Sequence, residues 1–546
     1  MSEKKVPQAR PRLGARALDA VERAGNRLPE PFLLFLLLFL AVGAASALMA
    51  ALGTTVDLPD GGTEPIRSLF SAEGLAWFTS TLVDNFIGFP PLGVVLTVLL
   101  GVGVAQRSGL LTALVRRAFG RAPRWMLPYV VGLIGVSANI MSDASMILVP
   151  SLAALVFAAA GRHPVAGLLG GFAASTAGFS VGPFITGTDA LLSGITTAAA
   201  EPVAAQTAPV TVVSNYFISL SCAVLLAGVA GLLIDKVLEP ALERRGVSRT
   251  PVAAAAGAPG AAAPAGGSGG TGGSGGEGEE ERADLRMDPE LSPVERWGLR
   301  WAGVALLVLA AAVLAVVLPP NAPLRGEGGA FLPESPLLDS VVFLVFLALA
   351  VPGVVYGAVT REITGGGDVA RMMAAAVRDM AGFIVVAFVL AQFLALFNWS
   401  RVSDWVAVSG AETLEGWNFT GYGALVAFVV LACVINVFVI SGSAQWAVFA
   451  AVFVPLFALL GYEPGFVQAL FRVGDSSTNA ISPLNPYMVV VLGLLRAYEP
   501  RAGLGTVIAR CLPFSLTFLV LWTAVLSLFY FTGTPVGPGM EARIAP

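Results

Sequence analysis

Residues 472–479, Arg-Val-Gly-Asp-Ser-Ser-Thr-Asn, followed closely by Ser482-Pro-Leu-Asn-Pro486, decide the fold of this chain. They lie inside an otherwise apolar stretch, 464–497. Gly, Pro and hydroxyl side chains in the middle of such a stretch predict a helix that is interrupted at membrane depth. The interruption frees backbone N–H and C=O groups, which are tolerated there only inside protein or along a water-filled cavity. The stretch therefore predicts a broken transmembrane helix that borders a binding site.

The same pattern occurs about 300 residues earlier. Gly161-Arg-His-Pro164 aligns with Gly461-Tyr-Glu-Pro464, and Pro183 aligns with Pro483. After the first turn, the segment 164–200 is again apolar and again interrupted, by Gly178-Phe-Ser-Val-Gly-Pro183 and Gly187-Thr-Asp189. The chain is therefore expected to contain a repeat with one broken helix in each half.

An apolar segment with a small polar centre precedes each turn, at 127–160 and at 421–460. The first arm of the earlier segment offers about 12 residues, too few to cross a hydrocarbon core of about 30 Å. We therefore expect two re-entrant hairpins, with tips at Ser137–Asp143 and Ser441–Trp446. In the expected topology they open from opposite sides of the membrane, so the repeats are inverted, as in secondary transporters.

The composition supports a membrane protein. Of 546 residues, 56% are hydrophobic and 12% charged, and the mean hydropathy is +0.79. Soluble domains carry about 25% charged residues, so a soluble enzyme is excluded. The net charge of −4 offers no basic surface for nucleic acid. Three widely spaced cysteines form no evident metal site, and His163 is the single histidine. We expect an all-α polytopic membrane protein that is not an enzyme.

Nine crossings with the N-terminus inside satisfy the positive-inside rule, because they place 27 of the 32 Lys and Arg residues on the inner side. Residues 251–285 are rich in Ala, Gly, Pro and Ser and predict a flexible tether. The expected parts are a basic cytoplasmic N-terminus (1–30), a first membrane half (31–240), the cytoplasmic tether region (241–296), a second membrane half (297–532) and an external C-terminal tail (533–546).

Four ionisable residues fall within the expected membrane segments: Asp143, Asp189, Arg472 and Asp475. Placing an ionisable side chain inside a membrane costs free energy, so such residues indicate a functional site unless another role is evident. Arg472 and Asp475, at i and i+3, can pair on one helix face, and an internal bridge that merely neutralises itself is the alternative to a functional role. Oxygen-rich side chains beside unwound backbone suit a hard cation such as Na⁺. The residues expected to serve a coupling cation or proton are Asn139, Asp143, Asp189, Asp475, Ser476, Thr478 and Asn479.

Trp446 follows the Ser-x-Ser sequence of the second hairpin tip, where it either packs in the bundle or stacks on an aromatic ligand. Asn139 and Asn436 are alternatively interhelical hydrogen-bond partners. No cofactor is expected beyond Na⁺ or H⁺ as the coupling ion, and no metal beyond that Na⁺.

Taken together, these motifs resemble the p-aminobenzoyl-glutamate transporter (AbgT) family. The resemblance covers about residues 20–240 and 295–530. It rests on Ala138-Asn139-Ile-Met-Ser142-Asp143, Gly161-Arg-His-Pro164, Gly187-Thr188-Asp189, Ser441-Gly-Ser443-Ala-Gln445-Trp446, Arg472-Val-Gly-Asp475-Ser-Ser-Thr478-Asn479 and Ser482-Pro483-Leu-Asn-Pro486-Tyr487. The departures from the family pattern are Ala138 for Ser, Gln445 for Lys, Ser482 for Thr, and the long tether.

The resemblance implies a homodimer in the bacterial inner membrane, with nine transmembrane helices, two hairpins, a scaffold domain and a transport core. It implies cation- or proton-coupled transport of p-aminobenzoyl-glutamate and, in some members, export of sulfonamide antimetabolites. The substrate-binding residues carried over by motif are Asp189, Ser443, Trp446, Pro464, Arg472 and Asp475. Gln445 removes one charge beside that site and leaves the exact substrate open.

Three other functions fit parts of the sequence. An ion-coupled dicarboxylate or organic-anion carrier would share the hairpin architecture. An intramembrane aspartyl protease would use paired Asp residues, but it needs a Gly-x-Gly-Asp motif, and Arg472 stands where its first Gly should be. That arginine would also keep Asp475 ionised. A membrane scaffold that transports nothing is the third alternative.

Overall fold

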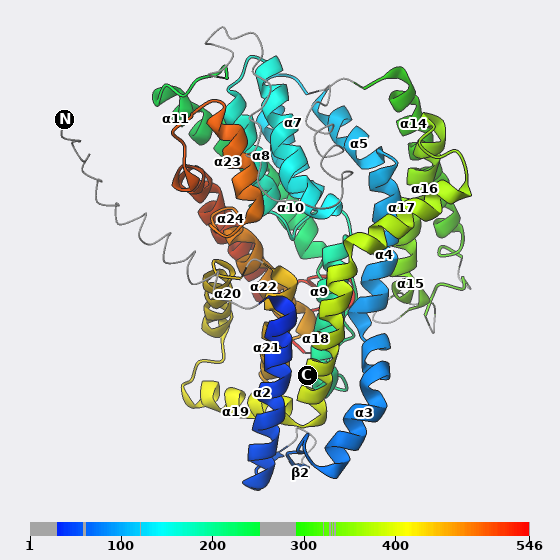
Figure 1. Ribbon diagram of the computed structural model, residues 1–546, viewed down its shortest axis with the longest axis vertical. Coiled ribbons are helices and arrows are strands. Elements are labelled where there is room, and N and C mark those ends of the chain that lie inside the picture. Colours follow the sequence, from blue (N-terminus) through cyan, green and yellow to red (C-terminus); the bar gives the residue numbers. More distant parts are fainter. Residues whose placement is uncertain are drawn as a thin grey trace, which may run out of the picture.

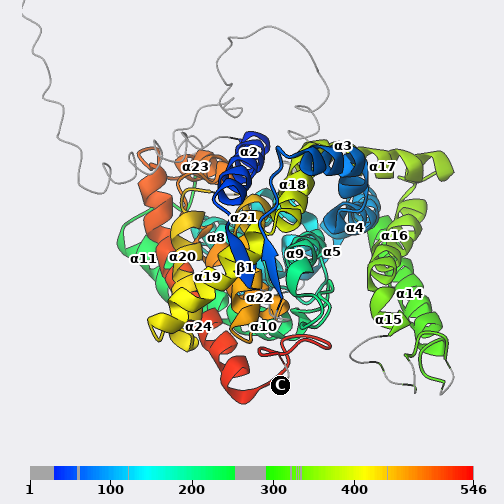
Figure 2. The same cartoon turned by 90° about the horizontal axis from the view of Figure 1, so that it is seen from below.

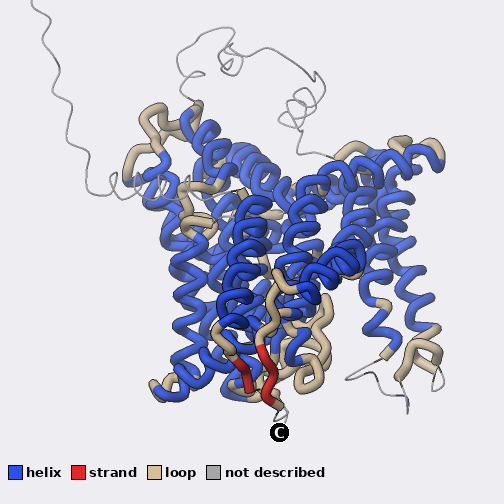
Figure 3. The backbone as a smooth tube through the Cα atoms, turned by 60° about the horizontal axis from the view of Figure 1, so that its bottom comes forward, coloured by secondary structure: helices blue, strands red, loops and turns tan. Residues whose placement is uncertain are grey.

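The computed structural model describes residues 30–57, 62–120, 122–251, 291–319, 322–326, 329, 331, 335–439 and 441–544, and it is almost entirely helical (Figure 1). All but the first residue of the expected tether, 251–285, and most of the basic N-terminus lie outside these residues. The one sheet in the described part pairs β1 (Thr55–Asp57) with β2 (Thr63–Pro65) in antiparallel register, at one end of the molecule (Figure 3).

The first half contains two candidate membrane spans before the hairpin, Pro31–Ala51 and Ala72–Arg107, and one after the broken helix, Tyr216–Arg244. Its elements are α2 (Pro31–Ala51), α3 (Ala72–Ile87), α4 (Pro90–Arg107), α5 (Leu110–Phe119), α6 (Leu127–Ser137), η1 (Ala138–Ala144), α7 (Ser145–Ala159), α8 (Pro164–Ala177), α9 (Gly187–Ala199), η2 (Glu201–Val203), α10 (Tyr216–Leu232), η3 (Leu233–Leu238) and α11 (Glu239–Arg244). Of these, η3 is a π-helix that continues α10 directly.

The second half has the same order of hairpin, broken helix and final long helix. Its elements are α14 (Pro293–Ala315), α15 (Pro336–Asp339), α16 (Val341–Thr360), α17 (Gly366–Asp379), α18 (Ala381–Trp399), α19 (Val402–Gly416), α20 (Tyr422–Asn436), α21 (Gly442–Leu459), α22 (Pro464–Thr478), α23 (Pro486–Arg496) and α24 (Leu504–Thr532). Helices α14, α15 and α16 stand at one side of the molecule, away from α20 and α24 (Figure 2).

Both hairpins are present. Arg162, just after α7, donates from Nη1 to the carbonyl of Arg124, just before α6, at 3.1 Å. In the second half, the Tyr462 hydroxyl, just after α21, donates to the carbonyl of Thr420, just before α20, at 2.9 Å. Each pair of arms therefore enters and leaves at the same end of the molecule. The arms α6 and α7 are about 16 and 22 Å long at 1.5 Å per residue, too short to cross separately.

The hairpins come from opposite ends. Figure 1 shows α7 and α8 in the upper half of the molecule and α19, α20 and α21 in the lower half. Helices α8 and α9 then continue downward as the first broken crossing, and α22 and α23 continue upward as the second (Figure 1). This opposed arrangement is the inverted repeat that the sequence predicts.

The two turns that join hairpin to broken helix have matching glycines, hydrogen bonds and prolines at an offset of 300. Gly161 and Gly461 both have φ in the left-handed region, +69° and +83°, which glycine adopts without steric cost. The next residue in each turn donates its N–H five residues back, to Phe157 and Phe457, at 2.8 and 2.9 Å. Pro164 and Pro464 then begin the broken helices, where the N–H that proline lacks would have no partner.

Nine described helices are long and apolar enough to span a membrane, but they are not the nine crossings expected from the sequence. The set includes Leu127–Ala159 and Gly442–Leu459, which belong to the hairpins. It omits the two broken helices, because each is divided into segments shorter than a full crossing.

The C-terminal tail folds back onto the protein. Val536 and Met540 are fully buried, and Met540 packs beside Gly465 of α22. Ile544 donates its N–H to the Gly461 carbonyl at 3.0 Å, which secures the second turn. The described residues of the expected external tail, 533–544, therefore pack against the second repeat.

Candidate functional site

The two hairpin tips and the second helix break enclose a cavity of about 440 Å³. This volume lies within the range of small-molecule sites. Its polar lining comes from tip 1 (Ser142, Asp143), tip 2 (Ser441, Gly442, Ser443), the second break (Asp475, Asn479, Asn485, Tyr487) and Thr188 of α9. Its apolar lining includes Met146, Phe179, Leu191 and Leu192, together with Val95 and Leu99 of α4 and Met380 between α17 and α18.

Asp475 is the buried carboxylate of this cavity. Its side chain accepts a hydrogen bond from the Ser476 hydroxyl at 3.3 Å. The Gly442 backbone at tip 2 approaches so closely that a Cβ there would lie 2.7 Å from Asp475 Oδ1. The second hairpin and the second break therefore meet at this carboxylate without an intervening side chain.

Arg472 does not pair with Asp475, so the alternative of an internal bridge between these two residues is not formed. Arg472 Nη1 instead lies 2.6 Å from Oδ1 of Asp189, which belongs to the other repeat. It also donates to the Ser180 carbonyl at 3.3 Å. The pairing differs because Asp475 faces the cavity and tip 2, whereas Arg472 lies one helical turn away against the first break.

Asp189 is engaged on both oxygens. Its Oδ2 accepts from the N–H and the hydroxyl of Thr186, both at 2.8 Å, and forms a capping box at the start of α9. Its Oδ1 accepts from Arg472. Asp189 does not line the large cavity; with Asn139 it lines a separate, small polar pocket. This carboxylate holds the first break in shape and joins it to α22.

A matching asparagine near each hairpin tip supports the unwound backbone. Asn139 donates to the carbonyls of Phe179 and Val181, at 2.6 and 3.1 Å. Asn436 donates to the Asp475 carbonyl at 2.5 Å and to the Thr478 hydroxyl at 2.8 Å. Carbonyls that an interrupted helix leaves without helical partners thus find donors at membrane depth.

The polar run after Asp475 is divided between the cavity and the breaks. Asn479 lines the cavity, and its side-chain oxygen accepts from Asn436. The Ser476 hydroxyl accepts from the Ser180 N–H at 3.2 Å, which joins the two breaks. Thr478 lies between Asn436 and the Gly474 carbonyl. Of the seven residues expected to serve the coupling ion, Asp143, Asp475 and Asn479 line the cavity.

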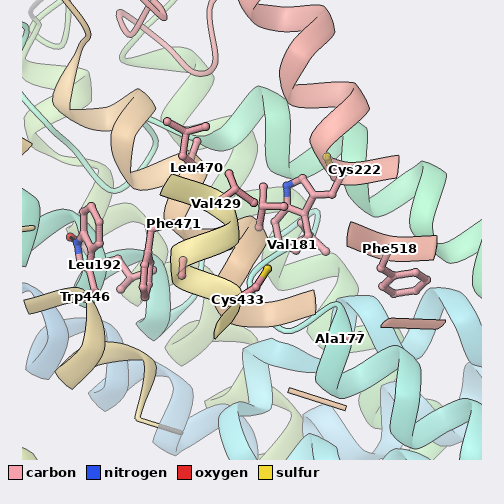
Figure 4. Packing of buried hydrophobic residues seen from close by; sticks show 14 of the residues in the cluster. Ala177, Val181, Leu192, Cys222, Val429, Cys433, Trp446, Leu470, Phe471 and Phe518 are labelled. Atoms are coloured by element: carbon pink, nitrogen blue, oxygen red, sulfur yellow. Dashed lines mark hydrogen bonds between the residues drawn. The ribbon is translucent and has the colours of Figure 1, made fainter. Parts of the chain in front are cut away.

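Of the residues expected to bind substrate, Ser443 and Asp475 line the cavity, whereas Trp446, Pro464 and Arg472 do not. The fully buried Trp446 lies between α9 and α22 (Figure 4): its Nε1 donates to the Thr196 hydroxyl at 3.0 Å, and its ring centroid is 4.7 Å from that of Phe471. Pro464 begins α22, at the end of the helix away from Asp475. Gln445 is also buried and donates to the Ala432 carbonyl, so it ties together the hairpin arms.

Sequence reasoning assigned no role to Tyr487 or Ser142. The Tyr487 hydroxyl lies beside Asp143, so hairpin tip 1 meets the second break. Ser142 has φ +49° and ψ −136°, a strained conformation for a residue with a Cβ, of a kind that clusters at functional sites. The Pro486-Tyr487 motif could have indicated Tyr487. Nothing in a single sequence indicates the backbone conformation of Ser142.

The described lining of the cavity carries two carboxylates, Asp143 and Asp475, and neither Arg nor Lys. Among the described residues, no group of three or more His, Cys, Asp or Glu side chains could hold a metal ion. Carboxylate, hydroxyl and amide oxygens of this kind are the ligands that hard cations prefer.

Residues 16–256 and 273–544 match the family described as the AbgT putative transporter family. The chain belongs to this family. It is therefore a multi-pass membrane transporter, and the opposed hairpins are those of an AbgT-family fold. One relative, the p-aminobenzoyl-glutamate transport protein of Escherichia coli, is 38% identical over 526 residues, which are 96% of this chain and 96% of that protein.

Two solved AbgT-family structures have the same fold. The Alcanivorax borkumensis YdaH transporter matches 93% of this chain and 100% of its own, with 36% identity and a TM-score of 0.82. Neisseria gonorrhoeae MtrF, described as illuminating a class of antimetabolite efflux pumps, matches 96% of this chain and 100% of its own, with 35% identity and a TM-score of 0.83.

Proposed function

We propose that the chain is an ion-coupled secondary transporter of p-aminobenzoyl-glutamate and related folate-type aromatic anions, and that it exports sulfonamide antimetabolites by the same route. The names of its relatives supply the substrate class. The observation that carries the coupling is the buried Asp475 in a cavity bounded by tips from two opposed hairpins.

Electrostatics connects ion binding to substrate binding. A substrate with two carboxylates meets Asp143 and Asp475 in the cavity, and like charges at this depth repel strongly. A proton or Na⁺ on these groups removes the repulsion, so an anionic substrate binds best when the ion is bound.

The proposed recognition of the aromatic ring uses tip 2. Ser443 hydrogen-bonds a ring substituent, and the apolar side chains of Met146, Phe179 and Leu192 contact the ring. Trp446 packs behind this surface. In a state in which hairpin 2 has moved, its ring stacks on the aromatic ring of the substrate. Arg472 meets a substrate carboxylate only in a state where Asp189 releases it.

The proposal places the chain in the bacterial inner membrane as a homodimer with its N-terminus inside. An export mode requires ion entry against substrate exit. The sulfonamide, which lacks the two carboxylates of the glutamate conjugate, is therefore exchanged by antiport, with ion and sulfonamide occupying the cavity in turn. Helices α14, α16 and α4 pack together as part of a scaffold, while the hairpins and broken helices form the transport core.

The test is transport by purified protein in proteoliposomes, with a proton gradient and a sodium gradient imposed separately. Asp475→Asn preserves volume and removes the charge, and it is expected to abolish gradient-driven transport of p-aminobenzoyl-glutamate. Asp189→Asn is expected to impair transport because it weakens the contacts that hold the first helix break against α22. The matched control is Glu541→Gln, an exposed carboxylate on the tail, which should transport normally. Full gradient-driven transport by both the Asp475 and the Asp189 variant would refute the coupling.

A further inference from the structure

A second large cavity lies far from the central site, at the end of the molecule where α6 begins and α7 ends. Its volume is about 560 Å³, and it is lined by Arg124, Trp125, Tyr129, Arg162, Asp235 and Lys236. Helix α7, about 22 Å long, separates this end of hairpin 1 from the tip at Asp143. The cavity therefore has no part in the transport site.

An ion-pair network forms the wall of this cavity. Arg162 lies 2.5 Å from Asp235 Oδ1 and also bonds Glu239, while Lys236 Nζ lies 2.7 Å from Asp235 Oδ2. The wider π-helical turn η3 contains Asp235 and Lys236, and Glu239 follows it directly. π-Helical turns are rare and occur frequently at functional sites.

The charges of the cavity favour an anion. Three cations and one carboxylate line it, and the count remains net positive after Glu239 behind Arg162 is included. The Lys236 side chain is 72% exposed, so its remaining donors are open. Arg124 uses Nη2 for the Gly161 carbonyl, which fixes the guanidinium at the rim. Arg and Lys donors in this arrangement suit phosphate oxygens.

An apolar surface continues from the cavity toward the middle of the molecule. Trp125 at the rim is 69% exposed, and Leu133 lies one turn beyond Tyr129 on α6 with half of its surface exposed. On α10, which packs against α6, Leu232 is exposed one turn before Lys236. A soluble phosphate compound would leave this apolar surface uncovered, whereas the acyl chains of a lipid would pack against it.

We propose that this cavity, between the start of α6, the Gly161 turn and η3, binds the headgroup of an anionic phospholipid. Arg124 and Lys236 hold the phosphate, Trp125 and Tyr129 lie at the level of the headgroup and glycerol, and the acyl chains follow Leu133 and Leu232. Aromatic and basic side chains gather at this level of membrane proteins for the same reasons. Because hairpin 1 begins and ends here, the lipid holds the base of the hairpin in place.

The test measures lipid binding by the delipidated full-length protein in detergent. Native mass spectrometry and thermal unfolding are followed with phosphatidylglycerol, with phosphatidylcholine of the same acyl chains, and with inorganic phosphate. Phosphatidylglycerol is expected to bind and raise the unfolding midpoint, while the other two do not. Arg124→Gln combined with Lys236→Gln should weaken phosphatidylglycerol binding by about tenfold or more, since each cation contributes to the attraction.

Arg371→Gln is the matched control. Arg371 is also an exposed cation paired with a neighbouring carboxylate, Asp368, but it lies on α17, away from the cavity. It should leave lipid binding unchanged. Lys236→Gln alone provides a milder variant if the double variant folds poorly. Equal binding of the two lipids, a similar effect of inorganic phosphate alone, or an equal loss in the Arg371 variant would each overturn the proposal.

Discussion

Arg472 and Asp189, 283 residues apart in the chain, form the ion pair that joins the broken helices of the two repeats. The Asp189 carboxylate also caps α9, and Arg472 also holds the Ser180 carbonyl. One buried pair thus stabilises the first break from both repeats. Any motion that separates the two broken helices at this point must break the ion pair. Otherwise the two helices move together.

The first prediction concerns this pair. Asp189→Asn leaves a buried arginine without its counter-charge, which is expected to destabilise the protein by about 3–5 kcal/mol. Arg472→Gln leaves Asp189 with only its Thr186 contacts and is expected to be damaging as well. The double variant removes both charges, so its loss should be smaller than the sum of the single losses. Denaturant unfolding of the four proteins in detergent measures the coupling; additive losses would contradict it.

Much of the fold could be predicted from the sequence because its signals are local. The left-handed glycines at 161 and 461 and the prolines three residues later fix the turns at the predicted positions. The short arm before Asn139 and the break at Gly178–Gly187 depend only on neighbouring residues. These features follow from backbone chemistry, which a single sequence displays.

The site could be predicted only in part, because its contacts join distant segments. Spacing alone allowed Arg472 to pair with Asp475, whereas its partner in the structure, Asp189, comes from the other repeat. The direction in which Trp446 points depends on Thr196 and Phe471, which no pattern places beside it. The buried tail lacked a signal too, since Val536 and Met540 lie in a short, glycine-rich stretch.

The second prediction concerns the contact between tip 2 and Asp475. Gly442→Ala adds a methyl group 2.7 Å from Asp475 Oδ1, so the carboxylate or the tip must shift. Transport of p-aminobenzoyl-glutamate is expected to fall at least tenfold, with folded protein retained. Gly493→Ala is the control, because a Cβ at that helical position meets nothing within 4 Å. Equal transport by the two variants would show that the tip tolerates displacement.

The third prediction separates packing from ligand contact at Trp446. Trp446→Phe keeps a ring against Phe471 but loses the hydrogen bond to Thr196, at a cost of about 1 kcal/mol. Trp446→Ala opens a cavity and is expected to cost about 3–5 kcal/mol. Binding titrations of p-aminobenzoyl-glutamate and a sulfonamide should show loss of both ligands in the alanine variant and retention in the phenylalanine variant. Unchanged binding by folded Trp446→Ala protein would remove the residue from recognition.

The fourth prediction concerns pH. His163, in the turn outside the membrane-spanning segments, is fully buried, and burial lowers its pKa, an effect that the contact with the Val247 carbonyl offsets only in part. The unfolded chain, with an imidazole pKa of about 6.5, then binds the proton more readily than the folded protein. Stability from this group is therefore present above that pH and is lost as the pH falls below it.

The measurement is the unfolding midpoint between pH 7.5 and 5.5 for the wild type and for His163→Gln, whose side chain still offers a donor to Val247. The wild type should lose more stability across this interval than the variant does. Carboxylates with ordinary pKa values near 4 change little in this window. Parallel curves for the two proteins would show that His163 makes no contribution.

The last prediction concerns the C-terminal tail as a clamp on the second repeat. Its N–H and carbonyl groups bond Gly461 and Glu463, and the Arg543 guanidinium lies over the rings of Tyr462 and Tyr530, at 5.5 and 5.3 Å. Because Val536 and Met540 are fully buried, truncation after Gly533 exposes apolar surface worth on the order of 3 kcal/mol or more. The truncated protein should unfold at a lower temperature, and Met540→Ala should reproduce part of the loss. Glu541→Gln, an exposed neighbour, should not. If truncation left the unfolding midpoint unchanged, the turn at Gly461 would be held by the Tyr462–Thr420 hydrogen bond and the packing of α22 alone.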